Sequence, residues 1–77
     1  MQLKIDEKDL LILKDTNDPV INKYLSKIQD ITEEDALDFM EYLYDKANEY
    51  LNGKNYTETP ESKTLEKVAD YIFDITK

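Results

Sequence analysis

The chain has 77 residues and a net charge of −8, and its composition excludes several kinds of chemistry. It contains no histidine, cysteine or tryptophan, and all ten of its cationic side chains are lysines. Imidazole and thiol catalysis and disulfide bonds are therefore excluded, and a single glycine is too few for a phosphate-binding loop. We expect one helical domain over residues 1–77 that is not an enzyme and holds neither a cofactor nor a metal ion.

The same composition gives expectations about source and location. Lysine without arginine, together with many isoleucine, asparagine and tyrosine residues, is typical of AT-rich coding sequence. This favours a low-GC bacterium, or its phage or plasmid. No apolar run approaches the roughly 18 residues of a membrane span, and the opening MQLKIDEKD lacks the apolar region of a signal peptide. We expect a cytoplasmic protein that does not bind a membrane.

The N-terminal segment has two interpretations. As a helix, it would begin with Asp6 as the N-cap, and Ile5 and Leu10 have the spacing of a hydrophobic staple. As a hairpin, QLKI and LLILK would pair across DEKD, which lacks the Gly or Asn that hairpin turns favour. We favour the helix, and the hairpin over residues 2–14 stays open as the alternative.

Four consecutive apolar residues follow in this segment. They are Leu10, Leu11, Ile12 and Leu13. On a helix, four consecutive side chains point in all directions, so one small core cannot cover them all. We predict that this run makes a protein interface, most simply in a homodimer.

A second helix is predicted after the turn at residues 15–18. Asp18 can cap it, with Pro19 at the first helical position, where the missing N–H costs nothing. Its apolar positions recur at helical spacing, and the helix is expected to end near Asp30. These positions are Val20, Ile21, Tyr24, Leu25 and Ile28.

The longest predicted helix extends from Thr32, its N-cap, to Gly53, its C-terminal stop. Its apolar residues fill an arc of roughly 160° at 100° per residue, which is wider than one neighbouring helix can cover. They are Ala36, Leu37, Phe39, Met40, Leu43, Tyr44, Ala47, Tyr50 and Leu51. We expect this helix to pack against two or more others.

Opposite the apolar arc lies a stripe of five acidic residues, Glu34, Asp38, Glu41, Asp45 and Glu49. Several of them are like-charged neighbours four residues apart, and each such pair costs a few tenths of a kcal/mol. Tyr42, a residue type common in interface hot spots, is predicted to lie exposed beside them. A stripe of this kind is usually only a solvated face; the functional alternative is that the stripe and Tyr42 form a candidate surface for a basic protein.

A last helix is predicted from Thr59, its N-cap, and Pro60 to about Ile75. Its apolar stripe is formed by Leu65, Val68, Ala69, Ile72 and Phe73. The sequence thus predicts an all-α bundle of three to four helices, in which the two long consecutive helices are antiparallel.

These features predict a small acidic protein-binding or regulatory module, and two mechanisms compete. In the first, the N-terminal apolar residues make a homodimer or another protein interface, and the acidic stripe only keeps the assembly soluble. In the second, the stripe imitates nucleic acid and occupies a basic nucleic-acid-binding surface, as an inhibitor or immunity-like protein. Direct binding to nucleic acid is not expected, because phosphates repel a chain of net charge −8.

Overall fold

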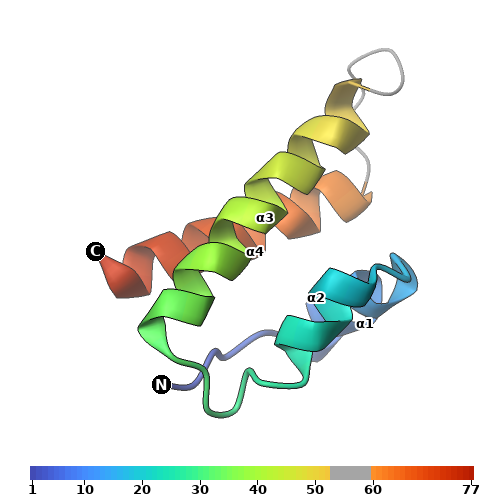
Figure 1. The fold of residues 1–77 in the computed structure, drawn as a ribbon. Helices are drawn as coiled ribbons and strands as arrows, with labels where there is room; N and C mark the ends of the chain where they lie inside the picture. The colour runs from blue at the N-terminus through green and yellow to red at the C-terminus, as the bar shows by residue number, and fades with distance from the viewer. Residues whose placement is uncertain (53–59) are drawn as a thin grey trace.

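The computed structural model describes residues 1–52 and 60–77, and this part of the chain forms four α-helices with no strand (Figure 1). The helices are α1 (Glu7–Asp15), α2 (Pro19–Leu25), α3 (Glu33–Asn52) and α4 (Pro60–Thr76). The long helices α3 and α4 run in opposite directions and cross, while α1 and α2 pack as a shorter pair beside them (Figure 1). The predicted all-α bundle with two long antiparallel helices is confirmed.

The core is centred where α3 meets α4. The buried positions of each helix recur at three- and four-residue intervals, so they form one face. They are Ala36, Phe39, Leu43 and Ala47 on α3, and Leu65, Val68, Ala69 and Ile72 on α4. The N-cap function predicted for Thr32 is confirmed, since its hydroxyl accepts from the backbone N–H of Asp35 at 3.1 Å.

Two residues assigned to the apolar faces of these helices are not buried. Leu37 on α3 is 38% exposed and Phe73 on α4 is 51% exposed. Both lie at the edge of their helix's apolar arc, where the other helices of the described residues leave them largely uncovered. The predicted caps Gly53 and Thr59, like the side chains of Tyr50 and Leu51, lie outside what the structure describes.

The helical interpretation of the N-terminal segment is correct from Glu7 onward, and the hairpin is wrong. Asp6 is the N-cap by position, although its side chain makes no capping hydrogen bond. The residues before it are not helical and pair instead with the turn that precedes α3. The N–H of Ile31 donates to the carbonyl of Met1, and that of Leu3 donates to the carbonyl of Ile28, both at 2.8 Å.

This pairing also explains why α2 is shorter than predicted. The helix ends at Leu25 rather than near Asp30, and residues 26–30 continue as turns with hydrogen bonds over three residues. Ile28 and Ile31 are both buried in these turns, beside the N-terminal residues. Tertiary packing therefore outweighs the helical spacing that predicted a longer helix.

A ring stack and an ion pair are among the contacts that join the shorter helices to the longer pair. The rings of Tyr24 on α2 and Phe39 on α3 stack with centroids 5.0 Å apart. Asp9 on α1, which is only 9% exposed, forms an ion pair with Lys67 on α4 at 2.9 Å.

No helix of the described residues is both long enough and apolar enough to cross a lipid bilayer.

Candidate functional site

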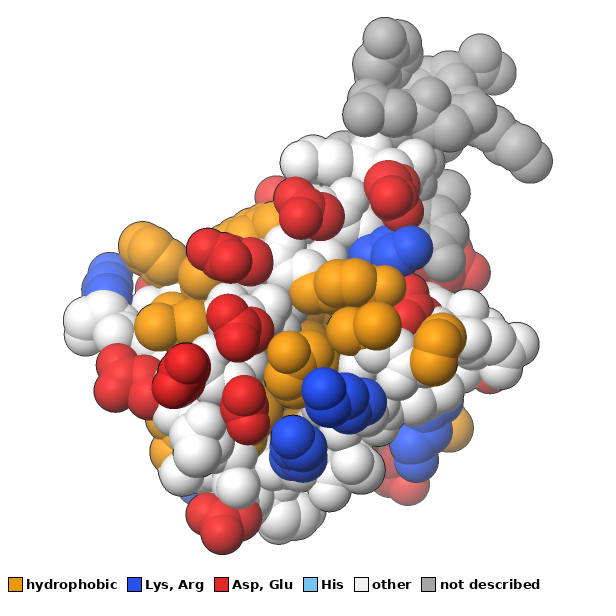
Figure 2. All heavy atoms as spheres, in the orientation of Figure 1, with side chains coloured by type: hydrophobic (Ala, Val, Ile, Leu, Met, Phe, Trp, Pro, Cys, Tyr) orange, Lys and Arg blue, Asp and Glu red, His pale blue; other side chains and the backbone are white. Residues whose placement is uncertain are grey.

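The acidic row consists of the five predicted side chains on α3, and all of them are exposed. They are Glu34, Asp38, Glu41, Asp45 and Glu49. In Figure 2, acidic groups follow α3 diagonally across the molecule, with hydrophobic groups on both sides. The structure therefore brings the predicted residues together on one continuous surface.

Most of the acidic row is not neutralised by lysine. Glu49 pairs with Lys46 at 3.1 Å, whereas the other four carboxylates form no ion pair within the described part of the chain. The nearby Lys27 pairs instead with Asp35, at 3.8 Å. Because like charges four residues apart repel, the row weakens α3 slightly unless a cation from elsewhere approaches it.

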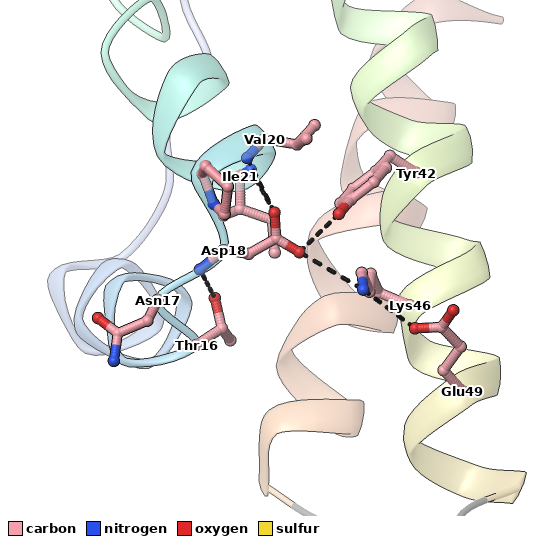
Figure 3. A pocket seen from close by; sticks show the side chains of 9 residues that line it. Thr16, Asn17, Asp18, Val20, Ile21, Tyr42, Lys46 and Glu49 are labelled. Carbon is pink, nitrogen blue, oxygen red and sulfur yellow. Dashed lines mark hydrogen bonds and ion pairs between the residues drawn. The ribbon is translucent and has the colours of Figure 1, made fainter.

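Beside the acidic row, toward α2, lies a polar cluster formed by Asp18, Tyr42, Lys46 and Glu49, which are bonded to one another (Figure 3). The hydroxyl of Tyr42 donates to one carboxylate oxygen of Asp18 at 2.6 Å, and the ammonium of Lys46 lies 3.6 Å from the same oxygen. The other oxygen accepts from the backbone N–H groups of Val20 at 2.8 Å and Ile21 at 3.3 Å. Asp18 therefore caps α2, as predicted, and also ties α2 to α3.

The cluster shifts the pKa values of its members. Burial alone would raise the pKa of Asp18, but hydrogen bonds from Tyr42 and the backbone, with the charge of Lys46, lower it below its ordinary value. Burial raises the pKa of Tyr42, and its hydrogen bond to the Asp18 carboxylate raises it further. The ionised carboxylate and the neutral phenol are thus the forms that the fold stabilises.

An open groove of about 550 Å³ lies over this cluster, between the start of α2 and α3. Its polar lining includes Asp18, Tyr42, Lys46 and Glu49, which already bind one another. The groove therefore directs few free polar groups toward a ligand, and we interpret it as a structural junction.

Among the described residues, no group of three or more acidic side chains is arranged to hold a metal ion.

The structure changes the interpretation of Tyr42. The sequence predicted an exposed residue beside the acidic row, but Tyr42 is half-buried and directed at Asp18. Tyr42 directly follows Glu41 of the row in the sequence, and its contribution to partner binding stays a prediction. The contact was missed because Asp18 lies 24 residues away, and nothing in the local pattern marks such a pair.

The four consecutive apolar residues that were predicted to make a homodimer, residues 10–13, differ in how deeply they are buried. Leu13 is buried, Leu10 and Ile12 are half-buried, and Leu11 is 58% exposed. The prediction that one core cannot cover all four is therefore correct, but only Leu11 remains largely uncovered. Homodimer formation through this segment stays a prediction.

Comparisons of the chain with protein-family models, with curated proteins and with solved structures give no match.

Proposed function

We propose that this chain is a small acidic module that binds a basic protein through α3 and catalyses no reaction. The observation that carries the proposal is the acidic row, in which four exposed carboxylates have no lysine partner among the described residues. A surface that serves only solubility more often mixes charges of both signs. We further propose that the module acts in the cytoplasm of a low-GC bacterium or as part of a mobile element, as the composition suggests.

The binding mechanism follows from the exposure of the row. Charges at the edge of an interface act mainly on the rate of association and on its salt dependence. An unneutralised row would attract a cationic surface over about one Debye length, roughly 8 Å at physiological ionic strength. Lys or Arg groups of the partner would then relieve the repulsion between neighbouring carboxylates.

A basic surface of this kind suits a protein that binds nucleic acid. The five carboxylates recur every three or four residues, which corresponds to about 4.5–6 Å along the axis at 1.5 Å per residue. Such a regular row of negative charges is a candidate mimic of a phosphate backbone. In this version, the module would occupy the nucleic-acid-binding surface of its partner as an inhibitor.

The test is capture of binding proteins from a lysate of the source cell, over a series of salt concentrations. We expect a basic protein that is retained at low salt and is lost from the variant carrying both Asp38→Lys and Asp45→Lys. The matched control carries Asp15→Lys and Asp30→Lys, which change the net charge equally at exposed positions away from the row. Equal retention by the two variants would contradict a role for the row.

Competition with nucleic acid then distinguishes a mimic of nucleic acid from a module that binds a basic protein in some other way. If the module mimics nucleic acid, a duplex of mixed sequence should displace the captured protein in proportion to its concentration. A partner that the duplex does not displace would contradict mimicry and leave a general protein-binding module.

Self-association through α1 is a second candidate function, and the exposure of Leu11 favours it. Sedimentation should give a mass near twice 9.1 kDa, and Leu11→Lys should reduce it to that of one chain. Leu11 is a better site for this charge than the half-buried Ile12, where a lysine would also disturb the fold. A single-chain mass at high micromolar concentration would contradict the homodimer.

A further inference from the structure

A second surface lies on the other side of α3, along its seam with α4 and away from α2. Four apolar or aromatic side chains remain incompletely covered there: Leu37, Met40, Tyr44 and Phe73. We call these four residues the seam strip. Met40 and Tyr44 pack against the core and are half-buried, whereas Leu37 and Phe73 are exposed.

Helical geometry places these four side chains together. Leu37, Met40 and Tyr44 are three and four residues apart, so they form one face of α3. The hydroxyl of Tyr44 donates to Asp70 on α4 at 2.5 Å, which fixes the register of the two helices on this side. Phe73 lies one turn beyond Asp70 on α4, and because the helices are antiparallel, this is the direction that leads from Tyr44 toward Met40 on α3.

Acidic side chains border the seam strip on both helices. The acidic row, including Glu41 and Asp45, borders it on α3, and a second set borders it on α4. The α4 set consists of Glu66, Asp70 and Asp74. The hydrogen bond to Asp70 and burial, followed by the charges of all three α4 carboxylates, raise the pKa of Tyr44 to about 12. These carboxylates therefore lie close enough to act on the strip.

The chain itself places one cation at this site. The ammonium of Lys77 lies 5.8 Å from the ring centroid of Phe73 and 3.8 Å from the carboxylate of Asp74. A lysine above an aromatic ring and beside an acid is the arrangement that a basic ligand would repeat along the seam.

We propose that the seam strip is the docking site for a basic amphipathic helix of the partner protein. Its apolar side chains would cover Leu37 and Phe73, and its lysines or arginines would reach the acids on either side. A second copy of this chain fits poorly, because it would bring together two acid-bordered surfaces of chains that each carry a net charge of −8. This inference rests on the proposed function and adds the apolar contact that charge alone does not supply.

The experiment uses two synthetic peptides of 18 residues, built from leucine and lysine only. One repeats leucine at helical spacing, and the other has the same composition in an order without an apolar face. Binding to the full chain is followed by fluorescence anisotropy at physiological salt. We expect the amphipathic peptide to bind at least about tenfold more tightly, as a buried apolar anchor typically contributes that much.

Two variants locate the binding site. Phe73→Ser should weaken binding of the amphipathic peptide about tenfold or more, with Leu37→Ser acting in the same direction. Ile75→Ser is the matched control: Ile75 is also exposed on α4 but lies one turn beyond Tyr71, whose hydroxyl accepts from the N–H of Lys4. By helical spacing it therefore lies on the same side of α4 as Tyr71, away from Phe73, and its substitution should leave the affinity unchanged.

Three results would overturn the inference. Equal affinity for the two peptides would show attraction by charge alone, which removes the seam strip but leaves the acidic row as a binding surface. Binding of neither peptide, even at low salt, would contradict the proposed function as well. A dimer of the chain that Phe73→Ser dissociates would show that a second copy covers the strip instead.

Discussion

The two sides of α3 differ in how far the chain satisfies its own side chains. Toward α2, Tyr42 and Lys46 bind Asp18, and Tyr24 stacks on Phe39. Toward solvent and the seam with α4, four carboxylates of the acidic row have no ion pair in the described residues, and Leu37 and Phe73 stay exposed. The first side joins α2 to α3, whereas the second leaves exposed charge and apolar area, which we propose as a binding surface.

Residues that join the helices and residues that we propose for binding therefore lie a few positions apart on α3. Tyr42 and Glu41 are adjacent in sequence but differ in environment: Tyr42 is half-buried and bonded to Asp18, whereas Glu41 is exposed and has no ion pair among the described residues. Substitutions on the first side should therefore change stability. Those at the acidic row and at the exposed Leu37 and Phe73 should change binding and leave the fold intact.

The largest loss of stability is expected in the core between α3 and α4. Leu43 is 0% exposed, so Leu43→Ala should lower the free energy of unfolding by about 2–5 kcal/mol, as for other buried leucines. Leu37→Ala removes the same atoms from an exposed position and should cost much less. Chemical denaturation of the two variants gives the comparison, and equal losses would show that the two sides of α3 do not differ as described.

A smaller effect is expected at the junction with α2. Asp18→Ala removes a helix cap and the acceptor of the Tyr42 hydroxyl, and together these should cost about 1–3 kcal/mol. Asp45→Ala, on the acidic row, should change the free energy of unfolding by less than about 0.5 kcal/mol. Urea titrations measure both, and a loss at Asp45 as large as that at Asp18 would contradict the division.

The contribution of the Asp18 junction to the free energy of unfolding should also depend on pH. Because the pKa of Asp18 is lowered in the folded state, its charge stabilises the fold fully above its unfolded pKa of about 3.9. This contribution is lost as the pH falls through the lower folded pKa. We therefore expect the stability difference between the wild type and Asp18→Asn to shrink below about pH 4 in urea titrations. A difference that stays constant down to pH 2 would contradict a lowered pKa.

The smallest effect on stability is expected on the acidic row. Reversing Asp38 and Asp45 to Lys converts the repulsive neighbours Glu34–Asp38, Glu41–Asp45 and Asp45–Glu49 into attractive ones, each by a few tenths of a kcal/mol. The double variant should be as stable as the wild type or slightly more so. A clear loss of thermal stability would show that these carboxylates make structural contacts.

The sequence predicted the features that depend on near neighbours in the chain. The caps at Asp18 and Thr32, the buried faces of α3 and α4 and the exposed acidic row all follow from residue type and helical spacing. The predicted end of α2 was wrong because residues 28–31 pair with the N-terminal residues, which lie nearly 30 positions away in the sequence. The half-buried state of Tyr42 was missed for the same reason.

The assignment of Leu37 and Phe73 to the buried faces was wrong for a different reason. Both residues fit the apolar periodicity of their helices, and periodicity cannot show how many neighbours a helix has. In the described structure, α1 and α2 pack on one side of the α3–α4 pair. A residue that periodicity assigns to the core can then face an uncovered seam, and the structure was needed to reveal it.

The most direct test is an NMR titration of the isotopically labelled chain with the basic amphipathic peptide. We predict backbone amide shifts in residues 34–45 of α3 and 66–74 of α4, with the amides of residues 16–25 around Asp18 unchanged. Shifts concentrated at residues 16–25 would instead place binding in the groove over the polar cluster. That result would contradict the division of α3 into a structural side and a binding side.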